Sequence, residues 1–341
     1  MSKKILVTGG TGFIGSHTVV ELYNAGYTPI IIDNLSNSNI KILDQIEQII
    51  AYRPAFYEFD LCDEIKTKEF IAQNSDIAGV IHFAAYKAVG ESVLKPLEYY
   101  KNNFFSLINL LEAYKNKPVN FVFSSSCTVY GQPDFLPVSE DAPIKKAESP
   151  YGNTKQIAEE ILQETCLVCA SLDVIVLRYF NPVGAHHTAL IGELPNGVPQ
   201  NLVPFITQSA IGKRAAIMIY GDDYNTPDGS AIRDYIHVVD LAKAHVSAIK
   251  RLEEKRSQNY EVFNIGTGKG SSVLEIINAF EQSTGEKLNY TIGKRREGDI
   301  EQTFGDVAKA NEILGWEATL DIKEMMNSAW NWEKYLRDNP F

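Results

Sequence analysis

The fold is decided near the start of the chain by the stretch Ile5-Leu-Val-Thr-Gly-Gly-Thr-Gly-Phe-Ile-Gly15. It begins with apolar and β-branched residues, as a buried strand does, and continues as a G-x-x-G-x-x-G loop. Glycines let a backbone approach a pyrophosphate closely, and the helix that follows points its N-terminus at the same anion. The stretch therefore predicts a dinucleotide site with Gly9, Gly12 and Gly15 in its phosphate loop.

The acidic residue Asp33 indicates which dinucleotide binds. It ends the next apolar segment, roughly 20 positions after the loop, where a carboxylate can accept hydrogen bonds from the adenosine ribose hydroxyls. The same charge would repel the 2′-phosphate of NADP, so we expect NAD as the cofactor. Asp60, at the end of the third apolar segment, either approaches the adenine edge or caps the following helix, and the sequence leaves both open.

Apolar segments alternate with helix-like stretches along the first half of the chain. The segments expected as strands are 4–8, 28–33, 55–60, 79–84, 119–125 and 173–180. The clearest helical spacing covers 149–170. Such alternation is typical of a parallel sheet with helices on both faces. We therefore predict an α/β fold, a doubly wound parallel sheet (Rossmann-like), with a second, smaller C-terminal substrate lobe.

The rhythm of the sequence changes after residue 180. Gly, Pro and Asn crowd the stretch 181–204, and the charged stretch 293–299 is expected in a loop. We predict an NAD-binding domain over 1–180 and a substrate-binding lobe over 181–341. Some segments, for example around 234–265, are expected to return to the first domain.

Composition limits the classes of partner. The chain has 341 residues, 45% of them hydrophobic and 22% charged, as in ordinary globular proteins. Its formal net charge of −11 argues against a nucleic-acid partner, which usually binds a basic face. No apolar run approaches the ~18 residues that a membrane span needs, and no signal-peptide pattern opens the chain. We expect a cytoplasmic protein with no membrane partner.

The cysteines give no sign of a disulfide framework or a metal site. Cys62, Cys127, Cys166 and Cys169 are scattered along the chain. The last two have CxxC spacing, but no second pair completes a four-ligand zinc site. We expect them to be buried residues near the end of a helix, and we expect no metal.

A second predicted site joins a strand end rich in serine to the start of a helix. Tyr151 and Lys155 lie one helical turn apart on the same face. A neighbouring ammonium, together with the positive nicotinamide of NAD, would lower the phenol pKa from its usual ~10 and make Tyr151 a base near neutral pH. Ser126 can bind the reacting hydroxyl or relay its proton, and Thr128 offers a second hydroxyl.

The Tyr-x-x-x-Lys spacing is weak evidence by itself. The chain contains a second copy, Tyr290 and Lys294, in a region expected to be a strand end running into a loop. The first copy differs in context, because it opens a helix and follows a strand that ends in hydroxyl groups. The alternative for the first copy is an ordinary surface tyrosine and lysine.

Together with the glycine loop, Ser126, Tyr151 and Lys155 resemble the extended short-chain dehydrogenase/reductase family in type and order. Longer runs are similar to the nucleotide-sugar epimerases of that family. They are His82-Phe-Ala-Ala-Tyr-Lys-Ala-Val-Gly-Glu-Ser92, Lys95-Pro-Leu-Glu-Tyr-Tyr100, Arg178-Tyr-Phe-Asn-Pro-Val-Gly-Ala-His186, Arg233-Asp-Tyr-Ile-His-Val238 and Arg295-Arg-Glu-Gly-Asp299. The resemblance covers essentially the whole chain, and runs of this length are far more specific than a short motif.

The resemblance implies two sets of binding residues. The NAD set consists of the three glycines of the phosphate loop together with further residues. These are Phe13, Ile14, Asp33, Asn34, Leu35, Ser36, Asn37, Ser38, Asp60, Leu61, Phe83, Ala84, Ala85, Tyr86, Lys87, Asn102, Ser126, Tyr151, Lys155 and Phe180. The nucleotide-sugar set is Ser126, Thr128, Tyr151, Asn181, Asn201, Leu202, Met218, Ile219, Tyr220, Arg233, Tyr235, Arg296, Asp299 and Thr303. The two arginines suit a diphosphate, whereas the asparagines and Asp299 suit sugar hydroxyls.

The implied activity is the interconversion of UDP-glucose and UDP-galactose through a transient 4-keto sugar and NADH. One alternative is a 4,6-dehydratase of the same family, which carries an Asp-Glu pair after the position of Ser126. Here Cys127 and Thr128 stand there instead. Another alternative is an NAD-sensing protein without catalysis, although a sensor has no need of the Ser126, Tyr151 and Lys155 set.

Two further expectations follow from the resemblance. Thr303 stands where strict glucose/galactose epimerases have a bulky tyrosine, so the sequence predicts some activity on UDP-N-acetylglucosamine and UDP-N-acetylgalactosamine. The alternative is that a neighbour such as Phe304 fills the space. The family also implies a homodimer through the helices expected at 94–114 and 149–170.

Overall fold

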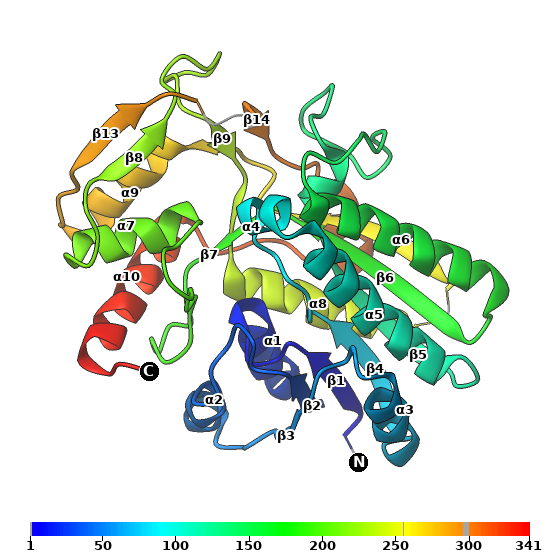
Figure 1. Ribbon diagram of the computed structural model, residues 1–341. Helices are drawn as coiled ribbons and strands as arrows, with labels where there is room; N and C mark the ends of the chain where they lie inside the picture. The colour runs from blue at the N-terminus through cyan, green and yellow to red at the C-terminus, as the bar shows by residue number, and fades with distance from the viewer. Residues whose placement is uncertain (1, 255, 296–299) are drawn as a thin grey trace.

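The computed structural model describes residues 2–254, 256–295 and 300–341 and contains a seven-stranded parallel sheet (Figure 1). The strand order is β11-β6-β5-β4-β1-β2-β3, with parallel neighbours throughout. The strands are β1 (Lys4–Thr8), β2 (Thr28–Asp33), β3 (Ala55–Glu58), β4 (Ile77–His82), β5 (Val119–Ser126), β6 (Leu172–Tyr179) and β11 (Tyr260–Ile265). The predicted doubly wound α/β fold is confirmed.

Helices cover both faces of this sheet because successive strand residues point to opposite sides. Ile5 and Val7 of β1 pack into one core, while Leu6 packs into the other. The first face is covered by α1 (Phe13–Asn24), α2 (Ile42–Ile50) and α8 (Val238–Leu252), and the second by α3 (Glu64–Gln73), α5 (Pro96–Tyr114) and α6 (Pro150–Val168). The near-continuous apolar strands are therefore buried on both sides.

Two predicted strands end two residues earlier than the apolar pattern suggests. The segments 55–60 and 79–84 stop as strands at Glu58 and His82. Their neighbours in the sheet end at the same level, because Glu58 pairs with Asp33 and His82 with Thr8. The residues that follow therefore leave the carboxyl edge of the sheet, where ligands of open α/β sheets bind.

The second lobe has its own core. Its elements are α7 (Leu202–Ala210), β8 (Ile217–Tyr220), α9 (Val273–Thr284), β13 (Tyr290–Gly293) and α10 (Ile322–Asp338). Ile206, Phe280 and Met326 are fully buried in this core. Figure 1 shows α7, α9 and α10 together with β8 and β13 to one side of the large sheet.

Short elements connect the two parts. They are α4 (Val89–Leu94), the 3₁₀-helix η1 (Cys127–Tyr130), β7 (Asn181–Val183), β9 (Ile232–Arg233), β10 (Tyr235–His237), β12 (Ser271–Ser272), β14 (Gln302–Thr303) and the π-helix η2 (Ala310–Leu314). The strand pair β10-β7 is parallel, and β12-β9-β14 forms a three-stranded sheet. The segments β11 and α8 lie with the large sheet. The division into 1–180 and 181–341 stays a prediction.

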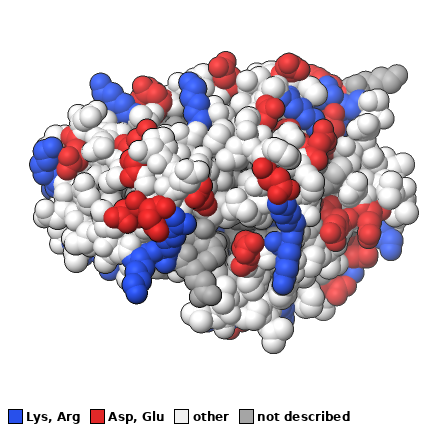
Figure 2. All heavy atoms as spheres, turned by 90° about the horizontal axis from the view of Figure 1, so that it is seen from above, with Lys and Arg blue, Asp and Glu red and all other residues white. Residues whose placement is uncertain are grey.

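No helix among the described residues is long and apolar enough to cross a membrane. Figure 2 shows basic and acidic side chains interspersed over the face that it presents. That face therefore carries charges of both signs, although the whole sequence has a formal net charge of −11.

Candidate active site

The glycine loop lies between β1 and α1 at the carboxyl edge of the sheet. Gly9 has a φ of +70°, and a β-carbon there would lie 3.0 Å from the backbone nitrogen of Ala84. A β-carbon on Gly15 would lie 2.2 Å from the carbonyl oxygen of Gly9. Both glycines are therefore required sterically, and the loop packs directly on the first turn of α1. This cradle has the form that a pyrophosphate needs.

Asp33 fixes the neighbouring loop from the end of β2. Its carboxylate is buried and accepts hydrogen bonds from the backbone nitrogens of Thr11 (3.2 Å) and Leu35 (2.9 Å). It also accepts one from Ser38 Oγ at 3.0 Å. The glycine loop and the stretch after β2 are thus held together by one carboxylate, as an adenosine site requires.

Asp60 lies beyond the end of β3 and is exposed. Its Oδ1 accepts a hydrogen bond from the backbone nitrogen of Cys62 at 2.8 Å, and its Oδ2 accepts one from Asn34 Nδ2 at 3.2 Å. The N-cap of α3 is Asp63, whose side chain accepts from the backbone nitrogen of Lys66. The helix-cap alternative for Asp60 is therefore wrong, and its contact with Asn34 places it next to the loop after β2.

The segment after β4 passes close to the glycine loop. Phe83 and Ala84 donate backbone hydrogen bonds to the carbonyl and hydroxyl oxygens of Thr8, at 3.1 and 3.2 Å. Lys87 lies farther along, and its Nζ is 3.3 Å from Glu193 Oε1. The predicted NAD contacts at 83–87 thus follow the same carboxyl edge as the glycines.

Asn103 is a site residue that the sequence reasoning missed. It is buried on α5, and its Oδ1 accepts a hydrogen bond from the backbone nitrogen of Tyr86 at 2.8 Å. Its Nδ2 donates to the Tyr86 carbonyl and to Thr154 Oγ1 at 3.1 and 3.0 Å. Asn103 therefore ties the segment after β4 to helix α6. The available signal was the adjacent pair Asn102-Asn103, of which only Asn102 was predicted.

The structure brings Ser126, Tyr151 and Lys155 together. Ser126 ends β5, and Tyr151 lies in the first turn of α6, where Ser149 caps the helix by accepting a hydrogen bond from the Gly152 nitrogen at 3.1 Å. The Ser126 hydroxyl lies near the Tyr151 phenol and favours the charged form of that phenol. Lys155 Nζ donates to the Ser124 carbonyl at 2.8 Å. The surface alternative is wrong, since Tyr151 and Lys155 are 6% and 5% exposed.

Burial acts against the pKa shift that we expected for Tyr151. Loss of solvation raises the pKa of its phenol well above the usual value, the neighbouring Tyr179 adds to this, and the Ser126 hydrogen bond opposes it. Burial also lowers the pKa of Lys155 to about 8, against the charge of Glu159. In the protein alone, desolvation is therefore the largest influence on the phenol pKa, and the Lys155 ammonium is not among its main influences.

Two residues beyond Ser126 shape the adjoining space. Thr128 Oγ1 is buried and has no hydrogen-bond partner among the described residues, so a substrate hydroxyl could pair with it. Burial raises the pKa of the Cys127 thiol to about 12, although the nearby charge of Arg233 lowers it. Cys127 therefore stays a neutral thiol at physiological pH, and the charge of Arg233 on β9 acts on it.

Arg233 and Thr303 are neighbours in the three-stranded sheet. They are paired in parallel register between β9 and β14, and Thr303 is 7% exposed. Arg233 Nη1 donates to the Ile232 carbonyl at 2.8 Å. The structure thus brings together two predicted residues that are far apart in the chain. Arg296 and Asp299 lie outside the described residues.

Two other predicted sugar residues, Asn181 and Asn201, make contacts that link separate segments of the chain. The Asn181 nitrogen donates to the Asp234 carbonyl at 2.9 Å, which joins β7 to the start of β10. Asn201 is the N-cap of α7, which begins at Leu202, and its Nδ2 donates to Glu193 Oε1 at 2.7 Å. Glu193, which the sequence reasoning also missed, therefore contacts a predicted residue of each set, Lys87 and Asn201.

The three predicted residues of strand β8 differ in the side of the strand on which their side chains lie. Met218 and Tyr220 are exposed, whereas the side chain of Ile219 is 2% exposed in the second core. Alternation along a strand explains the difference. The Ile219 side chain therefore faces the core, and this residue offers a ligand only its backbone. Tyr235, on β10, is buried in the same core, and Phe180 is buried against Val129.

The histidines and cysteines have structural surroundings. His82 Nδ1 lies 2.9 Å from Thr8 Oγ1, and burial lowers the pKa of its imidazole to about 3, which keeps it neutral. Cys166 is buried in α6, and Cys169 is partly buried at its C-cap. Within the described part of the chain, no group of three or more His, Cys, Asp or Glu side chains is arranged to hold a metal ion.

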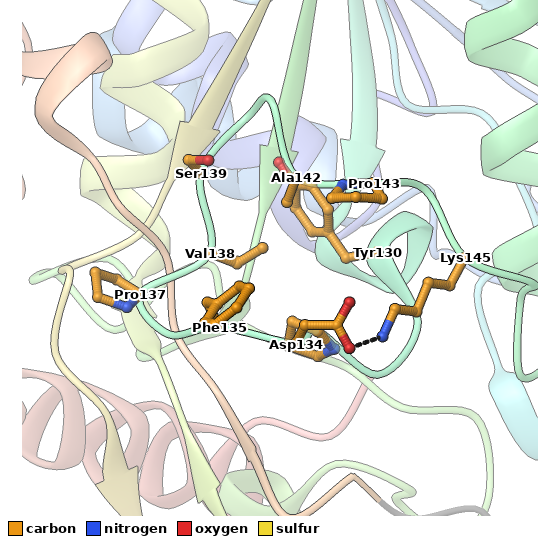
Figure 3. A pocket seen from close by; sticks show the side chains of 10 residues that line it. Tyr130, Asp134, Phe135, Pro137, Val138, Ser139, Ala142, Pro143 and Lys145 are labelled. Atoms are coloured by element: carbon orange, nitrogen blue, oxygen red, sulfur yellow. Dashed lines mark hydrogen bonds and ion pairs between the residues drawn. The ribbon is translucent and has the colours of Figure 1, made fainter.

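A separate small cavity lies in the loop before α6. Its volume is about 120 Å³, and Figure 3 shows it beside Tyr130, Phe135, Pro137 and Val138, with Lys145 paired to Asp134. None of the predicted binding residues lines it. The cavity is therefore distinct from the site at the carboxyl edge of the sheet.

A glycine cradle at β1 and a buried Ser126, Tyr151 and Lys155 set define the class of extended short-chain dehydrogenases/reductases. The profile of the GDP-mannose 4,6 dehydratase family matches residues 6–329. A UDP-glucose 4-epimerase of Dictyostelium discoideum is 49% identical over 97% of this chain and 95% of its own length. The chain belongs to the UDP-glucose 4-epimerase family.

Solved structures agree with this assignment. The UDP-glucose 4-epimerase of Stenotrophomonas maltophila, with NAD and formylated UDP-arabinopyranose bound, has a TM-score of 0.95 and 43% identity. It is covered over 99% of its length, and this chain over 98%. The enzyme of Bifidobacterium longum, in complex with NAD+ and UDP, has a TM-score of 0.92 and 46% identity, with 99% of both chains covered. The likeness therefore extends over both lobes.

Proposed function

We propose that this protein is an NAD-dependent UDP-glucose 4-epimerase, an isomerase that interconverts UDP-glucose and UDP-galactose. The observation that carries the proposal is the buried meeting of Ser126, Tyr151 and Lys155 beside the glycine cradle. Family membership supports it, as do the NAD and UDP ligands bound to the solved relatives. The burial of Tyr151 and Lys155 near the carboxyl edge of the sheet also supports the proposal.

The residues present fit NAD. The cradle excludes a β-carbon at Gly9 and Gly15, which matches the close approach of a pyrophosphate, and Asp33 stands at the adenosine end of the loop. The bound cofactor would supply the acceptor and donor of hydride, so that the sugar 4-carbon is oxidised and then reduced on its other face. The buried carboxylate favours NAD over NADP because a 2′-phosphate would meet its charge.

Tyr151 is the proposed proton acceptor for the sugar 4-hydroxyl, and Ser126 binds that hydroxyl and relays its proton. Because burial raises the pKa of Tyr151, the phenolate needs a stabilising charge. Lys155 provides one from the next turn of α6, and the positive nicotinamide ring would add a second. Proton transfer and charge stabilisation thus come from α6 and the end of β5.

The second lobe is proposed to hold the diphosphate while the sugar turns. Arg233 extends from β9 toward the space near Cys127 and can form paired hydrogen bonds with phosphate oxygens. Arg296 and Asp299 are proposed to complete the grip. Anchoring through the diphosphate leaves the hexose free to present either face to the hydride donor.

The dehydratase alternative is disfavoured by the residues after Ser126. Elimination of water needs further acid and base groups, whereas Cys127 is a neutral thiol and Thr128 a hydroxyl. Neither side chain can replace a carboxylate as an acid-base pair.

Incubation of the purified protein with UDP-galactose, without added NAD, tests the proposal. Carbon-13 NMR of the product should show UDP-glucose at equilibrium with the substrate, because each cycle regenerates the cofactor. A 4-keto-6-deoxy product would indicate a dehydratase. Calorimetric binding of the UDP-sugar without any turnover would indicate an NAD-sensing protein.

We also propose that the sugar pocket accepts N-acetylated UDP-sugars to some extent. Thr303 is small and lies beside Arg233 in the predicted hexose wall. The ring of Phe304 lies next to Gly270, where a β-carbon would be 3.1 Å from it. Turnover of UDP-N-acetylgalactosamine should be measurable in the wild type and fall at least tenfold relative to UDP-galactose in Thr303→Tyr, about 1.4 kcal/mol. An acetyl-sugar activity that survives the tyrosine would contradict the idea.

A homodimer and a cytoplasmic location stay proposals. Leu97, Phe105 and Ile108 of α5 are 81%, 48% and 38% exposed, and such a row of apolar side chains is typical of an interface. Light scattering should give twice the mass of one chain, and Phe105→Glu should reduce it to one. Phe135→Glu, in the loop before α6, is the matched control and should leave the dimer intact.

A further inference from the structure

Behind the catalytic set lies a buried ion pair that the mechanism above does not use. Arg178 of β6 donates from Nε to both carboxylate oxygens of Glu159 at 3.1 Å, and from Nη2 to Oε2 at 2.6 Å. Both residues are 6% exposed. A buried ion pair adds little net stability compared with a well-packed apolar pair. Its position therefore points to a role in placing neighbouring groups.

Glu159 is linked to the strand that carries Ser126. Its Oε1 accepts a hydrogen bond from Ser125 Oγ at 2.5 Å, and Ser125 directly precedes Ser126 in β5. In the sheet, Ser125 is paired with Arg178, and Ser126 with Tyr179. The ion pair therefore joins the ends of β5 and β6 to α6 at the level of the catalytic serine.

Glu159 also acts on Lys155 through its negative charge. It lies one turn farther along α6, on the same face. The other ionisable groups near this site are His82 on β4, Tyr130 of η1, Tyr151 on α6, Arg178 and Tyr179 on β6, and Tyr260 on β11, whose hydroxyl donates to the Glu159 carbonyl at 3.4 Å. The carboxylate favours the ammonium form of Lys155 and offsets the charge of Arg178.

On its outer side the pair is held by the loop that bears the small cavity of Figure 3. Arg178 Nη1 donates to Tyr130 Oη at 3.1 Å, and the Tyr130 hydroxyl donates to Asn264 Oδ1 at 2.6 Å. The same Nη1 donates to the Glu140 carbonyl at 3.2 Å. With both ends of the guanidinium bonded, neither charge can turn away from the catalytic set.

We propose that Glu159 and Arg178 are positioning residues, which hold Ser126 in place through Ser125 and keep a negative charge behind Lys155. The inference rests on the proposed epimerase function. It predicts two separable effects, since Ser125 transmits only geometry whereas Glu159 transmits geometry and charge.

Three variants separate these effects, with UDP-galactose as the substrate. Glu159→Gln should lower kcat roughly 10- to 100-fold with little change in KM, as misplacement of a reacting group does. On the alkaline side of the pH profile, kcat should also begin to fall about one pH unit lower. The reason is that loss of the carboxylate lowers the pKa of Lys155, which then loses its proton at a lower pH. Ser125→Ala should lower kcat without that shift. Glu159→Asp keeps the charge and should keep the wild-type pH profile.

Glu333→Gln is the matched control. Glu333 is another buried carboxylate, paired with Lys213 at 2.7 Å on α10 of the second lobe. It should lower the unfolding temperature while leaving kcat and its pH profile as in the wild type. If Glu159→Gln does not fold, Ser125→Ala and Glu159→Asp still decide between the two effects.

The outcomes distinguish failure of the positioning role from failure of the proposed function. The positioning role alone would be overturned if Ser125→Ala turned over the substrate at the wild-type rate and the Glu159 variants kept the wild-type kcat and pH profile. A pH shift in Glu333→Gln equal to that in Glu159→Gln would also overturn it. A wild type that does not epimerise UDP-galactose would overturn the proposed function and this inference with it.

Discussion

The chain contains two Tyr-x-x-x-Lys stretches with different surroundings. Tyr151 and Lys155 open helix α6, face the same side and are buried, at 6% and 5% exposure. Tyr290 lies on β13 with 45% exposure, and Lys294 follows the end of that strand as an exposed residue. A helix places side chains at this spacing one turn apart, whereas an extended chain sets them about 13 Å apart, so the same four-residue interval pairs the first copy and separates the second.

Burial gives the first copy its chemistry. Desolvation raises the pKa of Tyr151 and lowers that of Lys155 to about 8, so both groups are poised to respond to a ligand charge. Water screens an exposed pair from such a charge. The comparison teaches that a catalytic motif of this kind is defined by its helix and by the strand end opposite it, here Ser126.

The largest expected effect separates the two tyrosines. Tyr151→Phe should lower kcat by ~10²–10⁴, the usual contribution of general-base catalysis, because it removes the proton acceptor and little volume. UDP binding measured by calorimetry should stay near the wild-type value. Tyr290→Phe, the same change in the exposed copy, should leave kcat unchanged. A Tyr151→Phe variant with more than about a tenth of the wild-type rate would contradict the assignment.

The lysines should differ in the same way. Lys155→Ala should lose about 100-fold in kcat near pH 7 and recover partly as the pH rises. The sign follows from the phenol: without the ammonium the pKa of Tyr151 rises further, and more hydroxide is needed to form the phenolate. Lys294→Ala should match the wild type across the pH profile. A flat loss in Lys155→Ala from pH 6 to 10 would show that Lys155 acts by binding rather than by charge.

A smaller effect is expected when a buried carboxylate, Asp33, is compared with a surface carboxylate, Asp44. Asp33→Asn should improve the affinity for NADP relative to NAD by about tenfold, or ~1.4 kcal/mol, because it removes a buried charge facing the 2′-phosphate. Asp44→Asn makes the same change of charge at the surface, where Asp44 pairs with Arg53, and should not alter the preference. Both variants can be compared by fluorescence titration of the cofactor-free protein. Equal wild-type affinity for the two cofactors would contradict the role of Asp33.

Much of the fold could be predicted because its signals are local. Apolar strands, the glycine loop and the helix at 149–170 each depend on neighbours in sequence, and the structure has all of them. Strand ends were less certain, because β3 and β4 stop where their partners stop. The sequence predicted only that some segments, for example around 234–265, return to the first domain. It did not identify β11 as a strand of the sheet, because its pairing with β6 links residues distant in the chain.

The sequence by itself determined the phosphate loop, the acidic residue after β2 and the Ser126, Tyr151 and Lys155 set, because each is encoded by short-range spacing. Only the tertiary structure decided which Tyr-x-x-x-Lys copy is buried, that Asn103 ties the segment after β4 to α6, and that Thr303 lies beside Arg233. It alone joined Glu159 of α6, Arg178 of β6 and Ser125 of β5. The physical reason is that desolvation and side-chain pairing depend on the groups that surround a residue in space, and parallel strands bring those groups from distant parts of the chain.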